Sequence, residues 1–200
     1  MVATDPGSCS IAFKEWAGVC DALARGRQSI ILRKGGIREG TGPGAFVPEH
    51  REFWLYPTAV HQSRQGLRII GEGPDPGRQG PDSSIPIGLL ARVERIGRVR
   101  DEALLPALEE FHVLTPETVR GRFHYRTPGL WVLAARIWRR EPPFEIIATP
   151  EHAGCKTWVL LDEALPTSDL QASLDEPEWA SRLERLRAVL DREDTRAVPG

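Results

Sequence analysis

The stretch from Leu130 to Arg139 reads LWVLAARIWR and constrains the fold more than any other part of the chain. In an extended strand, successive side chains point to opposite faces, so residues two apart share a face. One face would then carry Trp131, Leu133, Ala135 and Ile137, and the other Val132, Ala134 and Trp138. A strand that is largely apolar on both faces must be covered on both, which predicts a central place in a sheet.

Other segments supply the remaining elements. Strands are predicted from short apolar or alternating runs at residues 30–32, 51–56, 85–99 and 156–164. A helix is predicted from Ser10 to Gly26, because apolar residues recur there at three-to-four spacing. Further helical segments are predicted at 101–111, 115–125 and 176–194, and Pro142-Pro143 is expected to end the central strand.

The order helix, strands, helix, strands, helix lacks regular β-α-β alternation. It therefore predicts an α+β fold, a single domain with a mixed, mostly antiparallel sheet of about five strands. The sheet would be flanked by an N-terminal helix and a C-terminal amphipathic helix. The core domain is expected over residues 10–165, with a flexible Gly/Pro-rich loop at 71–84. The helix at 175–194 would pack on this core or dock a partner.

Composition excludes several classes of protein. No apolar run approaches the roughly 20 residues that span a bilayer, and MVATDPGSCS lacks the features of a signal peptide. We therefore expect no membrane partner and a cytoplasmic location. Cys9, Cys20 and Cys155 are odd in number and widely spaced, which fits a reducing compartment.

Motif spacing excludes several chemistries. The sequence contains no P-loop, no G-x-G-x-x-G after a strand, no G-x-S-x-G elbow and no E-x-K nuclease element. His50-Arg51-Glu52 matches half of a zinc deaminase signature, but no P-C-x-x-C follows it. His152 and Cys155 are too few for a zinc site, which needs three or four ligands. No metal and no cofactor are predicted.

Basic residues concentrate in the N-terminal half. The net charge is only −2, yet residues 25–68 contain eight basic and three acidic residues, whereas residues 162–194 contain ten acidic and four basic. This asymmetry indicates a half that faces an anion, although an acidic tail that is simply solvated would also produce it. Arginines offer bidentate hydrogen bonds to phosphate, and glycines let a ligand approach the backbone. The predicted ligand-binding residues are Arg27, Arg33, Lys34, Gly35, Gly36, Tyr56, His61, Gln62, Arg122 and His124.

The stretch HREFWLYPTAVHQ, residues 50–62, holds the catalytic candidates His50, Glu52 and His61. Strand periodicity places His50 and Glu52 on one face, where a carboxylate can orient an imidazole for acid–base work. The same two residues can also form a plain surface ion pair. His61 would reach His50 only if the chain turned back at Pro57, because eleven extended residues span roughly 36 Å.

The ordered segments LRKGGI, F-x-L-Y-P-T and HQ, followed by GCKTWVLL, resemble the bacterial domain-of-unknown-function 1802 family. The similarity runs from about Phe13 to Asp162. The resemblance implies an uncharacterised protein with a loose link to restriction-modification or DNA metabolism. It also implies that residues 71–82 form a variable loop, and it assigns no catalytic residue.

We therefore predict a module that binds an anionic ligand, either nucleic acid or a nucleotide, through arginines on phosphate and aromatic rings on bases. One alternative is a hydrolase or phosphoesterase that uses His50, Glu52 or His61 for proton transfer. Another is a structural protein that docks a partner through its C-terminal helix.

Overall fold

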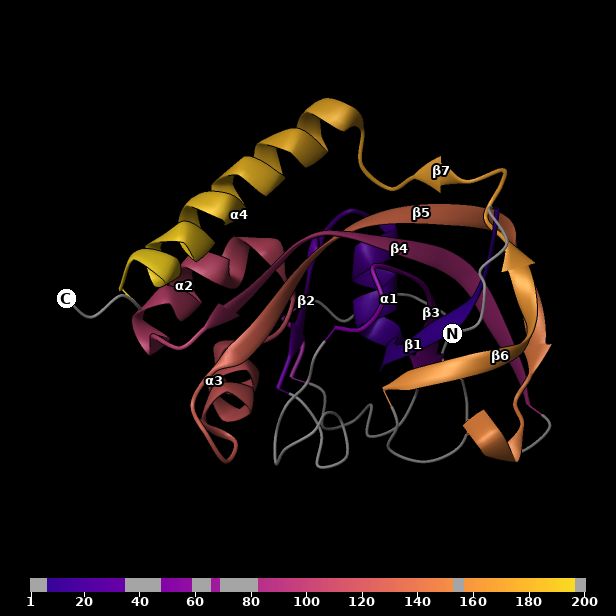
Figure 1. The fold of residues 1–200 in the computed structure, drawn as a ribbon, viewed down its shortest axis with the longest axis horizontal. Helices are drawn as coiled ribbons and strands as arrows, with labels where there is room; N and C mark the ends of the chain where they lie inside the picture. The colour runs from indigo at the N-terminus through magenta and orange to yellow at the C-terminus, as the bar shows by residue number, and fades with distance from the viewer. Residues whose placement is uncertain (1–6, 35–47, 59–65, 69–82, 153–156, 197–200) are drawn as a thin grey trace.

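One curled sheet organises the chain (Figure 1). The computed structural model describes residues 7–34, 48–58, 66–68, 83–152 and 157–196. Six strands follow the order β2-β5-β4-β3-β1-β6, and β7 pairs with β5. Their bounds are β1 Ser8–Trp16, β2 Ile30–Arg33, β3 Glu52–Thr58, β4 Ser84–Val99, β5 Leu130–Ile147, β6 Trp158–Pro166 and β7 Gln171–Ala172. Only β1 and β3 pair in parallel among the described strands, and the other pairs are antiparallel.

The long antiparallel pair of β4 and β5 forms the middle of the sheet, as the apolar run from Leu130 predicts. Pro142 and Pro143 do not end β5, contrary to the sequence expectation. The register shifts opposite them, between Ile87 and Leu89 of β4, so the prolines lie in an irregularity of the ladder. There the missing N–H donors break no regular hydrogen bond, and the strand continues to Ile147.

The N-terminal helix is shorter than predicted, because residues 8–16 form β1 and only Ala17–Ala24 form α1. β1 lies between β3 and β6, and it packs Phe13 into one hydrophobic cluster and Ala12 into another, so both of its faces are covered. Apolar residues at three-to-four spacing fit a doubly covered strand as well as a helix, and the pairing partners decide between them. β3 likewise passes Pro57 to end at Thr58, where it pairs with β1 alone.

The two faces of the sheet belong to two hydrophobic clusters. In β3, Phe53 and Leu55 pack into the larger cluster, whereas Trp54 and Tyr56 pack into the smaller one. This alternation is that of an extended strand, in which successive side chains point to opposite faces. The larger cluster also contains α1 and the apolar stripe of the C-terminal helix, Trp179, Leu183, Leu186 and Leu190.

Short helices connect β4 to β5. The segment 102–111 consists of the 3-10 helix Glu102–Leu104, α2 (Leu105–Leu108) and the 3-10 helix Glu109–Phe111. Pro106 lies in the first turn of α2, where a missing N–H is tolerated. α3, Pro116–His124, begins at Thr115, whose hydroxyl accepts from the N–H of Thr118. A further 3-10 helix covers Pro150–His152.

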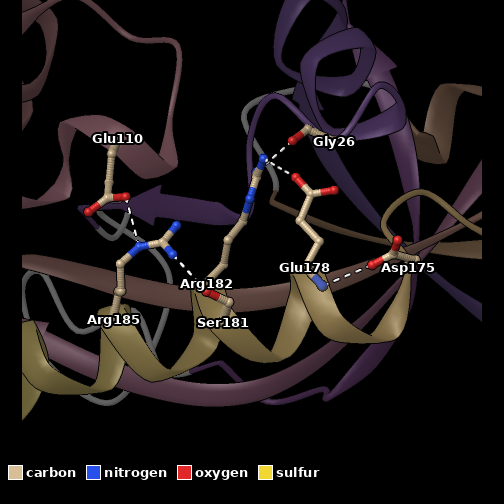
Figure 2. A network of polar contacts seen from close by, with 7 residues as sticks. All are labelled: Gly26, Glu110, Asp175, Glu178, Ser181, Arg182 and Arg185. Carbon is tan, nitrogen blue, oxygen red and sulfur yellow. Dashed lines mark hydrogen bonds and ion pairs between the residues drawn. The ribbon is translucent and has the colours of Figure 1, made fainter.

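The C-terminal helix α4, Glu176–Arg196, lies along the sheet and is held by polar contacts as well as apolar ones (Figure 2). Arg182 donates to the carbonyl of Gly26 at 2.5 Å, and Arg185 donates to Glu110 at 3.0 Å. Asp175 caps the helix by accepting from the N–H of Glu178 at 2.9 Å. Within the described residues, α4 is therefore part of the packed domain.

The structure confirms an α+β domain with a mixed, mostly antiparallel sheet, an N-terminal helix and a C-terminal helix. The sheet has seven strands among the described residues instead of about five, because β1 and the short β7 were not expected. No helix within the described ranges is long and apolar enough to cross a membrane.

Candidate functional site

Arg33 is the last residue of β2, and its side chain contacts β1 across the curled sheet. Its guanidinium donates to the carbonyl of Lys14 at 2.5 Å, and its Cζ lies 4.4 Å from the ring centroid of Phe13. Lys14 and Phe13 belong to β1, which lies four places from β2 in the strand order. The side chain of Arg33 therefore reaches across the concave side of the sheet to a distant strand.

Arg122 approaches the same place from α3. Its Cζ lies 4.3 Å from the ring centroid of Trp16, and it donates to the carbonyl of Leu32 at 3.1 Å. Burial lowers the pKa of Arg122; the Glu15 carboxylate raises it, and the positive charge of Arg33 lowers it further. The charge of Arg33 therefore acts on Arg122, and both residues are among the ligand-binding residues predicted from the sequence.

Glu15 supplies a carboxylate that acts on Arg122, and it is not among the site residues predicted from the sequence. Its residue is only 3% exposed, and its carboxylate accepts from the N–H of Trp16 at 2.8 Å. Glu15 lies two positions after Phe13 in β1, so both residues face the side that Arg33 covers. The signal available in the sequence was a single carboxylate, next to Lys14, in the run IAFKEW.

Lys34 follows β2 and caps the end of α3. Its ammonium donates to the carbonyls of Phe123 at 2.8 Å, Gly129 at 3.0 Å and Thr127. Burial lowers the pKa of Lys34, and the nearby charge of Arg98 lowers it further. Lys34 therefore orders the segment between α3 and β5 while adding positive charge.

The pairing of β2, β5 and β4 places the Arg98 side chain near these cations. Arg33 of β2 pairs with Trp131 of β5, and Trp131 pairs with Arg98 of β4, so the three side chains lie on one face. The Cζ of Arg98 lies 5.6 Å from the Trp131 ring centroid. We name Arg33, Lys34, Arg98 and Arg122 the basic cluster. Among the residues that the structure describes, no carboxylate lies within ion-pair distance of Arg33, Arg98 or Arg122.

Other predicted ligand-binding residues lie elsewhere. Arg27 forms an ion pair with Asp21 at 2.6 Å, beside α1. His124 lies 3.0 Å from Glu102 and is exposed. Tyr56 is buried on the opposite face of the sheet, where burial raises its pKa. These three residues have local partners and do not join the basic cluster.

The predicted catalytic candidates do not pair with each other where they are described. Glu52 accepts from Arg92 at 2.6 Å, across the β3–β4 pair. His50 packs edge-on against Trp158, with 4.9 Å between the ring centroids. Gly35, Gly36, His61 and Gln62 lie outside the described residues.

Within the described ranges, no group of three or more His, Cys, Asp or Glu residues is arranged to hold a metal ion. His152 is buried and accepts from the N–H of Thr149 through Nδ1 at 3.3 Å. Cys155, its partner in the two-ligand hypothesis, lies outside the described residues.

Comparison with known proteins adds the family. Residues 12–185 match the family described as Domain of unknown function (DUF1802). The chain belongs to this family. The family resemblance inferred from LRKGGI, F-x-L-Y-P-T and HQ is thereby confirmed, and the basic cluster of this DUF1802 chain lies within the matched range.

No curated protein matches the DUF1802 chain. Among solved structures it is similar to the crystal structure of ASCH from Zymomonas mobilis, at 16% identity and a TM-score of 0.39 over 88% of this chain and 94% of that one. A mutant of the same ASCH protein matches at 14% identity and a TM-score of 0.41, over 88% and 96% of the two chains. At these values the likeness assigns no residue role to the DUF1802 chain.

Proposed function

We propose that this chain binds the phosphate groups of nucleic acid or of a nucleotide at the basic cluster. The observation that supports the proposal is the crowding of like charges. Arg33, Arg98 and Arg122 have no carboxylate within ion-pair distance in the described part of the chain. Positive charges held close together without such partners favour an anion between them.

The chemistry of the cluster suits phosphate. A guanidinium presents a planar fork of donors that matches two phosphate oxygens, and its charge does not depend on pH in the physiological range. Arg33 and Arg98 flank Trp131 on one face, so a phosphate could contact both while the indole offers a stacking surface. Glu15 would orient Arg122 rather than contact the anion, because Glu15 is buried.

Tyr125 and Arg126 follow α3 and add an aromatic ring and a positive charge next to the segment that Lys34 binds. Tyr125 is 53% exposed, and the guanidinium of Arg126 lies 5.2 Å from its ring centroid. An exposed tyrosine beside a cation is suited to stack on a base whose phosphate meets the arginines. Gly35, Gly36, His61 and Gln62 stay in the proposal as sequence predictions, as does a cytoplasmic location.

A binding titration tests the proposal. Fluorescence anisotropy would be measured with labelled single-stranded and double-stranded DNA and RNA, and with a labelled nucleotide, over a series of salt concentrations. We expect binding that weakens as salt rises, because each phosphate contact releases condensed counterions. Absence of salt-dependent binding near physiological ionic strength for all of these ligands would contradict the proposal.

A further inference from the structure

The segment between α3 and β5 is held by the ammonium of Lys34. Lys34 donates to the carbonyl of Phe123 at 2.8 Å, to that of Gly129 at 3.0 Å and to that of Thr127. These carbonyls lie on both sides of Tyr125 in the sequence. Tyr125 therefore belongs to a short segment whose two ends are fixed at one cation of the basic cluster.

Arg98, a second cation of the basic cluster, lies at the end of the same segment. A Cβ atom placed on Gly129 would lie 3.6 Å from Nε of Arg98 and 3.2 Å from the carbonyl oxygen of Val99. The φ angle of Gly129 is +132°, a conformation that residues with a side chain rarely adopt. Glycine at this position thus lets the segment pass close to Arg98.

Tyr125 carries an exposed aromatic ring on this segment. It is 53% exposed, and among the described residues Ile147 and Leu160 are the other large hydrophobic residues that are exposed. The guanidinium of Arg126 lies 5.2 Å from the ring centroid of Tyr125. Arg126 has a φ angle of +63°, which is unfavourable for a residue other than glycine. Unfavourable backbone conformations of this kind are concentrated at ligand-binding sites.

Glu102 supplies a carboxylate at the end of α3. It lies 3.0 Å from His124 and 3.8 Å from Arg120. The charge of Glu102 is therefore offset by Arg120, and the segment with Tyr125 keeps the positive charge of Lys34 and Arg98. A phosphate beside the Tyr125 ring would meet net positive charge.

We propose that the chain binds single-stranded nucleic acid in preference to a duplex, with one base stacked on Tyr125 and the adjoining phosphates on Arg126 and the basic cluster. In a duplex each base is covered by its neighbours, so only a single strand offers a base to the tyrosine ring. A mononucleotide could stack on Tyr125, but it brings a single phosphate group to several cations. This inference rests on the function proposed above and names the class of its ligand.

Fluorescence anisotropy provides the test. The probes are a labelled single strand of about 12 nucleotides, in a DNA and an RNA form, the same strands annealed to their complements, and a labelled nucleoside monophosphate. We expect the single strand to bind about 5-fold or more tightly than its duplex and than the monophosphate, because stacking of one base provides at least this ratio. Comparison of the DNA and RNA forms shows which sugar is preferred.

Substitutions at the segment separate stacking from charge. Tyr125→Leu should weaken single-strand binding about 5-fold or more and leave duplex binding unchanged, whereas Tyr125→Phe should keep the preference. Ile147→Ala, at a residue that is 54% exposed, is the matched control and should change neither. Arg126→Gly relieves the left-handed backbone, so it should weaken single-strand binding without lowering the melting temperature.

The inference and the proposed function fail in different ways. If the duplex or the monophosphate binds as tightly as the single strand, or if Tyr125→Leu binds the single strand like wild type, the inference is overturned while phosphate binding at the basic cluster stands. If none of the probes shows salt-dependent binding, the proposed function is contradicted and the inference with it.

Discussion

The guanidinium of Arg122 lies over the indole of Trp16, with 4.3 Å between Cζ and the ring centroid. Trp16 is the last residue of β1 and immediately precedes α1, whereas Arg122 belongs to α3. This contact therefore joins the third helix to the strand that carries Glu15. Arg122 also donates to the carbonyl of Leu32, one residue before Arg33. The contact with Trp16 therefore helps to fix the position of the basic cluster.

Arg122→Leu should lower the free energy of unfolding by about 2–4 kcal/mol, since it removes a cation–π contact and a charged hydrogen bond. Arg122→Lys should lose less, because the charge remains but the planar fork does not. Urea denaturation measures both. Arg120→Leu on the exposed side of the same helix is the control and should change stability by less than about 0.5 kcal/mol. Equal effects at the two positions would contradict the structural role of Arg122.

Stability should depend on pH through His112. Burial lowers its pKa from 6.5 to about 4, with further lowering by the charges of Arg68 and Arg122. Between these two values the unfolded chain binds a proton that the folded chain does not, so the free energy of unfolding falls as the pH falls. The slope is at most about 1.4 kcal/mol per pH unit, and the loss is complete below about pH 4.

Urea denaturation at several pH values from 7.5 to about 4.5 would compare wild type with His112→Asn. The asparagine variant should show a shallower decline, because carboxylates titrate equally in both proteins and only the histidine contribution is missing. Parallel declines in the two proteins would show that His112 does not titrate as described.

α4 should contribute to the stability of the domain and not serve mainly to dock a partner. Leu186 is 2% exposed in the larger cluster, so Leu186→Ala should cost about 2–4 kcal/mol in unfolding free energy. Arg187→Ala, at the exposed neighbouring position, is the control and should be nearly neutral. Comparable small changes at both positions would favour the alternative in which this helix serves mainly for docking.

Lys34→Met should loosen the segment between α3 and β5. The substitution removes the ammonium that bonds the carbonyls of Phe123, Thr127 and Gly129. Amide hydrogen exchange of residues 123–130 should become faster, while exchange in the paired strands β4 and β5 after Leu130 should change little. Unchanged exchange in 123–130 would contradict the capping role.

Local patterns predicted much of the fold. The apolar run from Leu130 identified the central strand, because the two-residue period depends only on neighbouring positions. Ser10–Trp16 was misassigned because a strand covered on both faces can carry the spacing of a helix. Its identity depends on β3 and β6, which are distant in sequence.

Only part of the candidate site could be predicted from the sequence. Arg33 and Lys34 could be predicted, because they end a recognisable strand at basic positions. Arg98 and Glu15 could not, since cross-strand register and the curl of the sheet bring them to Arg33.

The most direct test of the anion-binding account is the salt dependence of oligonucleotide binding by Arg98→Met. Arg98 contacts the Trp131 ring and can be replaced by another long side chain at little structural cost. Arg187→Met, an exposed arginine substitution on α4, is the matched control. We predict that Arg98→Met weakens binding of a single-stranded oligonucleotide several-fold and reduces the slope of log K against log salt by about 0.7. Wild-type affinity and slope in Arg98→Met, or an equal loss in Arg187→Met, would contradict the account.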